Sequence, residues 1–226
     1  VQKVRLDRKV SLARATIEDL AGLRPVSGVD ATATADLSTL TIQVAGGKAD
    51  RVVLGASPVV ITGLDAEDQN ITINLTGKNS VSDVIRLIDQ PPLHYARAVG
   101  LKPEQGTGMA DLDVKLGFPL LKDLPLRAMQ IDAKAKIADL ASDKLVPGVT
   151  ISQGNLLLAV DGEKLSVTGK AAYNDIPLET TYQQRFSAPA TGTAPQASAT
   201  LKGEVTTADI AKFGLPLEGM TAPLPV

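Results

Sequence analysis

The 226-residue chain has a net charge of −2 and no cysteine, and 44% of its residues are hydrophobic while only 3% are aromatic. This hydrophobic fraction is typical of a folded protein, and the length allows a sizeable core. The near-neutral charge gives no reason to expect nucleic acid as a partner. The lack of cysteine excludes disulfides, thiolate metal sites and cysteine nucleophiles. No apolar run approaches the ~18–20 residues that span a bilayer.

Strict alternation of apolar and polar residues is the main signal along the chain. It begins at residues 40–44 and 71–75, recurs at 110–116, 131–137 and 156–160, and continues at 165–169 and 199–205. Such alternation places the apolar side chains of a strand on one face. The pattern therefore predicts many antiparallel strands, each with one wet face.

Turn-forming pairs separate these runs. Gly46-Gly47, Asp161-Gly162 and Asn174-Asp175 lie where hairpins are expected to reverse the chain. Residues 186–200 are rich in Ala, Ser, Thr, Pro and Gly, which predicts a long excursion between strands.

The expected helices are few and short. Ser80 is a suitable N-cap for a helix over residues 81–88, which Pro91 and Pro92 end. Further helical turns are predicted at residues 93–99 before Gly100, at 207–213 and at 16–20.

The stretches 16–28 and 207–219 resemble each other, since each combines a short predicted helix with a Pro-x-x-Gly turn. This similarity predicts repeat units at residues 1–24, 25–215 and 216–226, the last of them the start of a further unit. We expect the whole chain, 1–226, to be an internal segment of a longer protein.

Roughly a dozen one-sided strands accompany only about 30 helical residues in this interpretation. Each Leu or Ile left exposed forgoes roughly 1.5–3 kcal/mol of burial, so the strands need a cover. Either the sheet closes as a β-sandwich, or its apolar face stays partly open for a ligand. Alanines at inward positions, such as Ala133 and Ala135, leave room for one, although a sandwich core built with alanine fits the pattern equally well.

Two stretches carry a resemblance to a known family. Residues 89–103, followed by 106–118, form the first, and residues 167–178 with 182–186 form the second; 145–154 lies between them. They resemble the AsmA-like superfamily, in particular its YhdP and TamB types. The resemblance implies a mostly β fold, a long curved antiparallel sheet forming a repeating β-groove with a few short helices. It also implies a role in lipid transport across the bacterial periplasm, with an anchor in the inner membrane and a possible outer-membrane partner.

The resulting hypothesis is an apolar groove that holds phospholipid acyl chains, with no cofactor, metal or catalytic residue. The predicted lining consists of aliphatic residues from four strands: Leu112, Val114, Leu116, Ile131, Ala133, Ala135, Ile137, Leu156, Leu158, Val160, Leu165 and Val167. The alternative is a structural or interaction module of the cell envelope without bound lipid.

An enzyme is the least favoured reading. His94 is the only histidine, which removes most catalytic triads and all multi-histidine metal sites. Asp111 and Asp113 alternate with apolar residues and are interpreted as part of a solvated strand face.

Overall fold

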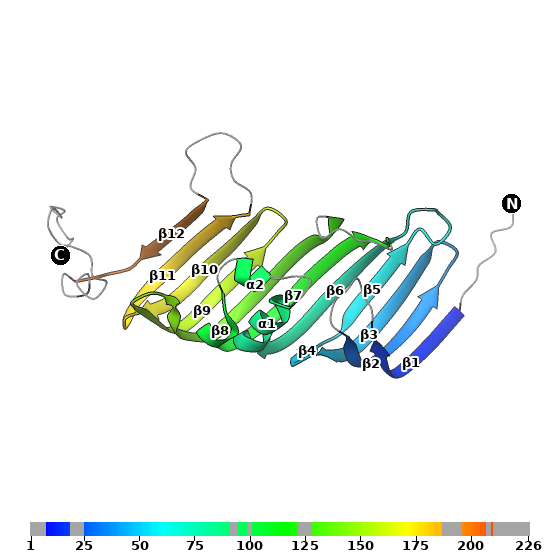
Figure 1. The fold of residues 1–226 in the computed structure, drawn as a ribbon, viewed down its shortest axis with the longest axis horizontal. Coiled ribbons are helices and arrows are strands. Elements are labelled where there is room, and N and C mark those ends of the chain that lie inside the picture. Colours follow the sequence, from blue (N-terminus) through cyan, green and yellow to red (C-terminus); the bar gives the residue numbers. More distant parts are fainter. Residues whose placement is uncertain are drawn as a thin grey trace.

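The computed structural model describes residues 8–18, 25–90, 95–98, 101–121, 128–186, 196–206 and 209. They form one open, twelve-stranded antiparallel sheet with short helices on one face (Figure 1). The strands are β1 (Arg8–Ile17), β2 (Val26–Ala35), β3 (Thr39–Ala49), β4 (Val52–Leu54), β5 (Ser57–Thr62), β6 (Asn70–Ser80), β7 (Thr107–Pro119), β8 (Gln130–Val146), β9 (Val149–Val160), β10 (Lys164–Tyr173), β11 (Ile176–Arg185) and β12 (Ala197–Lys202). The mostly β, open-sheet prediction is confirmed, and the alternative of a closed β-sandwich is wrong.

The strands follow one another as a meander, so that each pairs with the next along the chain. Only β4 leaves this path, because it pairs with β3 alone while β3 also pairs with β5. Consecutive connections therefore alternate between the two sides of the sheet at which the strands end. We call the side with the connection 81–106 the helix edge, and the side with the connections 36–38, 63–69 and 161–163 the loop edge; neither name refers to the outermost strands β1 and β12.

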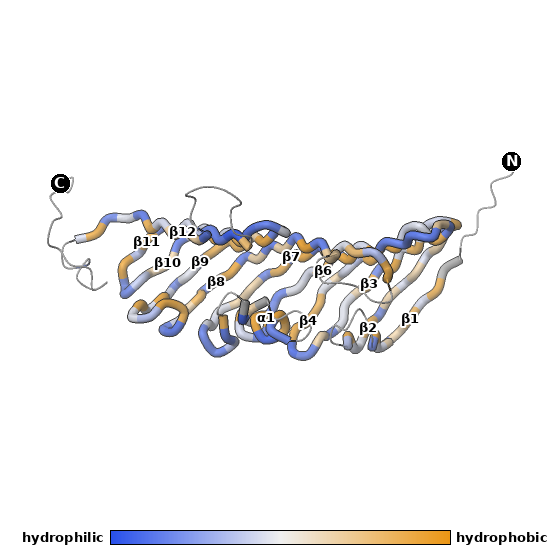
Figure 2. Tube along the Cα trace, turned by 45° about the horizontal axis from the view of Figure 1, so that its top comes forward, coloured by the Kyte–Doolittle hydropathy of each residue, from blue (hydrophilic) through white to orange (hydrophobic). Residues whose placement is uncertain are grey.

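Hydrophobic and hydrophilic residues alternate along most strands (Figure 2). Of the predicted hairpins, Asp161-Gly162 joins β9 to β10 and Asn174-Asp175 joins β10 to β11. Asn174 and Asp175 both have positive φ, 49° and 67°, as a two-residue hairpin turn requires. The hairpin predicted at Gly46-Gly47 is wrong, since both residues lie inside β3. A side chain at Gly47 would approach Val26 Cγ1 to 3.0 Å, so close packing of β2 explains the glycine there.

β-Bulges interrupt the regular pairing near the helix edge. Ile137 pairs with Leu156, and Leu140 pairs with Gly154. The segment between these pairs is therefore one residue longer in β8 than in β9, and Asp139 within it has φ 53°. An extra residue in β9 follows, where Gln153 also has φ 53°. Bulges bend a strand and increase its twist, so they curve this end of the sheet. The extra residue in β8 also keeps Ile137 and Leu140 on the same face although they are three positions apart.

Three short helical segments connect β6 to β7: α1 (Val81–Ile88), α2 (Tyr95–Ala98) and the 3₁₀ turn η1 (Pro103–Gln105). The prediction of α1 is confirmed, including its N-cap, because the Ser80 hydroxyl accepts a hydrogen bond from the Asp83 backbone N–H at 3.1 Å. Within the predicted turn at residues 93–99, only 95–98 are described, and these are α2.

Two predicted elements differ from the observed ones at the ends of the sheet. The helix expected at residues 16–20 is wrong in its first half, because Thr16 and Ile17 complete β1; residues 19–24 lie outside the described part. The excursion predicted to end at residue 200 is shorter, since β12 begins at Ala197. Of the helix expected at 207–213, only Asp209 is described.

Candidate functional site

All twelve predicted lining residues lie on one face of the sheet, across β7, β8, β9 and β10. The strand register places them in rows that run across the sheet: Val114–Ala133–Val160–Leu165, Leu112–Ala135–Leu158–Val167, Leu116–Ile131 and Ile137–Leu156. Because antiparallel partners point to the same side of a sheet, each row is a continuous line of aliphatic side chains. Their placement on one face is therefore confirmed, and their role as a lipid lining stays a prediction.

The apolar face extends beyond the predicted residues toward β1. Ile73 pairs with Leu116, Val59 with Ile73, and Ile42 with Val59, so the same face continues over β6, β5 and β3. Alternation at residues 40–44 and 71–75 indicated β3 and β6 but not β5, and only the register shows that the three strands share this face. Toward β12 the face becomes polar at β11, where Thr180, Tyr182 and Gln184 continue the rows.

The helical connection covers the apolar face at the helix edge. Val81 and Ile85 of α1 pack in a buried cluster with residues of β7, β8 and β9. Four predicted lining residues belong to this cluster or pack against it: Leu112, Ile137, Leu156 and Val167. They are thus part of a core that the chain closes with its own helix.

Toward the loop edge the same face has no such cover among the described residues. Leu116 packs beside a second cluster, formed by Ile71, Ile73 and Phe118, and Ala135 is buried between its neighbours. The remaining six predicted residues are half-buried and belong to neither cluster: Val114, Ile131, Ala133, Leu158, Val160 and Leu165. We call these six residues the open patch.

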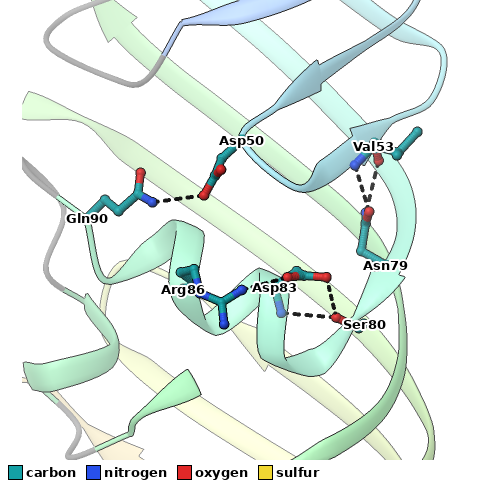
Figure 3. Close-up of polar contacts among 7 residues, drawn as sticks. All are labelled: Asp50, Val53, Asn79, Ser80, Asp83, Arg86 and Gln90. Carbon is teal, nitrogen blue, oxygen red and sulfur yellow. Dashed lines mark hydrogen bonds and ion pairs between the residues drawn. The ribbon is translucent and has the colours of Figure 1, made fainter. Parts of the chain in front are cut away.

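Side-chain contacts link the chain on either side of α1 to β4 and to the β3–β4 connection (Figure 3). The buried Asn79 accepts a hydrogen bond from Val53 N at 2.7 Å and donates one to Val53 O at 2.9 Å, which fixes β4 beside β6. At the other end of α1, Gln90 donates to Asp50 Oδ2 at 3.1 Å. Sequence analysis missed Asn79, because alternation only assigns it to the apolar face, where a polar residue needs a partner.

The opposite face of β7 and β8 is charged and exposed. The register sets Asp111 against Lys136, Asp113 against Lys134, and Lys115 against Asp132. The interpretation of Asp111 and Asp113 as part of a solvated face is confirmed, since both are exposed. No group of three or more His, Cys, Asp or Glu residues suited to a metal occurs in the described part of the chain. His94 lies outside the described residues.

Two groups in the described part of the chain have shifted pKa values, and both lie in connections between strands. Hydrogen bonds from the backbone N–H groups of Glu163 and Lys164 lower the pKa of Asp161, which caps the β9–β10 turn. The hydrogen bond from Arg97 to Asp89, with its charge, raises the pKa of Arg97. Both groups make their hydrogen bonds within connections: Asp161 in the β9–β10 turn and Arg97 in the β6–β7 connection.

The apolar face is an open surface rather than an enclosed cavity. A pocket of about 300 Å³ lies elsewhere, lined by residues of β10–β12 and their neighbours: Lys170, Pro177, Leu178, Glu179, Lys202 and Gly203. The register aligns Lys170, Glu179 and Lys202 in one row on the opposite face of the sheet, where Lys170 and Glu179 form an exposed ion pair at 3.2 Å. Within the described residues, no helix has the length and hydrophobicity to cross a membrane.

Comparison with known proteins adds no relative. No family model, no curated protein and no solved structure matches the chain.

Proposed function

We propose that the apolar face of β7–β10 binds the acyl chains of phospholipids in the bacterial periplasm. The observation that carries the proposal is the open patch, a continuous aliphatic surface that the described chain leaves without cover. These six side chains are half-buried, so their remaining contact with water costs only a part of the roughly 1.5–3 kcal/mol that full burial of a large aliphatic side chain contributes. An apolar ligand that covers them recovers this free energy.

The chemistry of the patch suits a flexible hydrocarbon chain. Its members are Val, Leu, Ile and Ala, without an aromatic ring or a hydrogen-bonding side chain, so it selects for apolar character and not for a polar group. Its uncovered side faces solvent, where a headgroup can remain hydrated. The sequence resemblance to the AsmA-like superfamily agrees with this ligand and supports periplasmic lipid transport with attachment to the inner membrane and a possible outer-membrane partner.

Two adjacent leucines of β9 allow a matched test. Leu158 lies in the open patch, whereas Leu157 points to the opposite face and is 55% exposed. We expect Leu158→Asp to reduce the phospholipid that co-purifies from a bacterial periplasm, measured by native mass spectrometry and lipid extraction. Leu157→Asp places the same charge one residue away and should leave lipid binding unchanged. Ile137 is unsuitable for this test, because it packs against the cluster beneath α1.

A second measurement uses the absence of tryptophan from the chain. The tryptophan fluorescence of Leu158→Trp should be quenched by phospholipids brominated on their acyl chains, and that of Leu157→Trp should not. Circular dichroism establishes that each variant is folded. A folded protein that binds no lipid, or equal quenching at both positions, would refute the proposal and favour a structural module.

A further inference from the structure

One row of the open patch ends in an amide side chain. The row that runs from Val114 of β7 to Leu165 of β10 continues into β11, where Gln184 is the register partner of Leu165. The four aliphatic residues of this row all belong to the open patch. Because antiparallel partners point to the same side of a sheet, Gln184 lies on the apolar face directly beside the patch.

The amide of Gln184 has hydrogen-bonding capacity to spare. The Tyr182 hydroxyl donates to Gln184 Oε1 at 2.9 Å, so one end of the amide is engaged and its orientation is set. Within the described part of the chain, no side chain or backbone oxygen accepts a hydrogen bond from Gln184 Nε2. Both residues are half-buried on an otherwise aliphatic surface. A donor in such surroundings needs an acceptor, and here the acceptor has to come from a ligand or from water.

The length of the row fits an acyl chain that starts at Gln184. The row crosses four strand spacings between β11 and β7, which amounts to about 19 Å at ~4.8 Å per spacing. Each leaflet contributes about 15 Å to the hydrocarbon core of a bilayer. A lipid whose glycerol backbone lies at β11 can therefore extend an acyl chain along the open patch as far as β7.

The surroundings of Gln184 favour a neutral acceptor. The register places the cationic residues of β10, β11 and β12 on the opposite face: Lys164, Lys170, Arg185 and Lys202. Phosphate groups are typically bound by cationic side chains. An amide N–H donates readily to an uncharged carbonyl oxygen, and the ester carbonyls are the uncharged acceptors at the start of each acyl chain.

We propose that Gln184 Nε2 donates a hydrogen bond to an ester carbonyl of the bound lipid and thereby fixes the glycerol backbone at β11. This inference rests on the proposed function and adds to it the acyl-ester linkage and a specificity-determining residue. The open patch holds the hydrocarbon, and Gln184 distinguishes an ester lipid from an ether lipid. A single neutral hydrogen bond has a modest net effect, so we expect a preference of roughly two- to tenfold for the ester.

The test is competition between two phosphatidylcholines that differ in the ester carbonyls alone. The full chain is incubated with vesicles that contain equal amounts of the dioleoyl diester and the dioleyl diether, and the captured lipid is quantified by mass spectrometry after re-isolation. Gln184→Leu removes the amide and extends the aliphatic row. Gln183→Leu is the matched control, because Gln183 is exposed on the opposite face of the same strand. Circular dichroism establishes that each variant is folded.

We expect the wild type and Gln183→Leu to capture more diester than diether. Gln184→Leu should capture the two equally, with its capture of the diether undiminished. Equal capture by the wild type, or a preference that survives in Gln184→Leu, would overturn the ester contact and leave acyl-chain binding intact. An equal loss of both lipids in folded Gln184→Leu would also overturn it, because the phosphate that both share would then be the acceptor. Capture of neither lipid by the folded wild type would overturn the proposed function and this inference with it.

Discussion

Asn79 offers the sharpest test of how β4 is held beside β6. Its side chain is 5% exposed and bonds to both the N–H and the C=O of Val53, at 2.7 and 2.9 Å. β4 pairs with β3 as a strand, and the Asn79 side chain of β6 provides the hydrogen bonds to Val53 that a second neighbouring strand would otherwise make. Asn79→Ala removes both hydrogen bonds while leaving the backbone of β6 unchanged.

The expected loss follows from the two bonds. Each contributes about 1 kcal/mol net, so Asn79→Ala should lower the free energy of unfolding by about 2 kcal/mol. Val53 is 54% exposed, so water can replace part of the lost bonding, and no further penalty is added. For a chain of this length, about 2 kcal/mol corresponds to a fall of roughly 4–8 °C in the melting temperature.

Urea and thermal unfolding followed by circular dichroism measure this loss. Asn70→Ala, at an exposed position of the same strand, is the control and should change the unfolding free energy by less than about 0.5 kcal/mol. Asn79→Asp keeps the acceptor for Val53 N but places a carboxylate against Val53 O, so its stability should recover as acid protonates that group. Equal stability of Asn79→Ala and the wild type would refute the role assigned to Asn79.

Three further predictions concern local geometry. Gln153→Gly should raise the unfolding free energy by about 0.5–1 kcal/mol, because an L-residue is strained at φ 53°; Gln183→Gly, at an exposed position of β11, should lower it instead, and urea titration distinguishes the two. Ser80→Ala should cost about 1 kcal/mol by removing the N-cap of α1, with rescue by Ser80→Thr, and an unchanged melting temperature would contradict the cap. The lowered pKa of Asp161 means that its stabilising contribution is present above the unfolded pKa of about 3.9 and is lost as pH falls through the folded value. The stability difference between wild type and Asp161→Ala should therefore be largest near neutral pH and shrink in acid; a difference independent of pH would contradict this assignment.

Local sequence indicated the strands β3, β6–β10 and β12, their faces and the main helix. Alternation is a local property, and it correctly placed the aliphatic residues of β7–β10 on one side; Ser80 and the Asn174-Asp175 pair marked a helix start and a turn through their own backbone preferences. The same local logic failed at Gly46-Gly47, where glycine serves close packing between strands rather than a turn.

Only the tertiary structure decided which part of the apolar face is covered. Leu156 and Leu158 are two positions apart on the same face of β9, yet one lies in the cluster beneath α1 and the other in the open patch. The difference depends on where the β6–β7 connection folds back and on the bulges at Asp139 and Gln153, which curve the sheet and keep the register. Alternation states which side of a strand is apolar, but contacts between distant segments decide whether that side is buried.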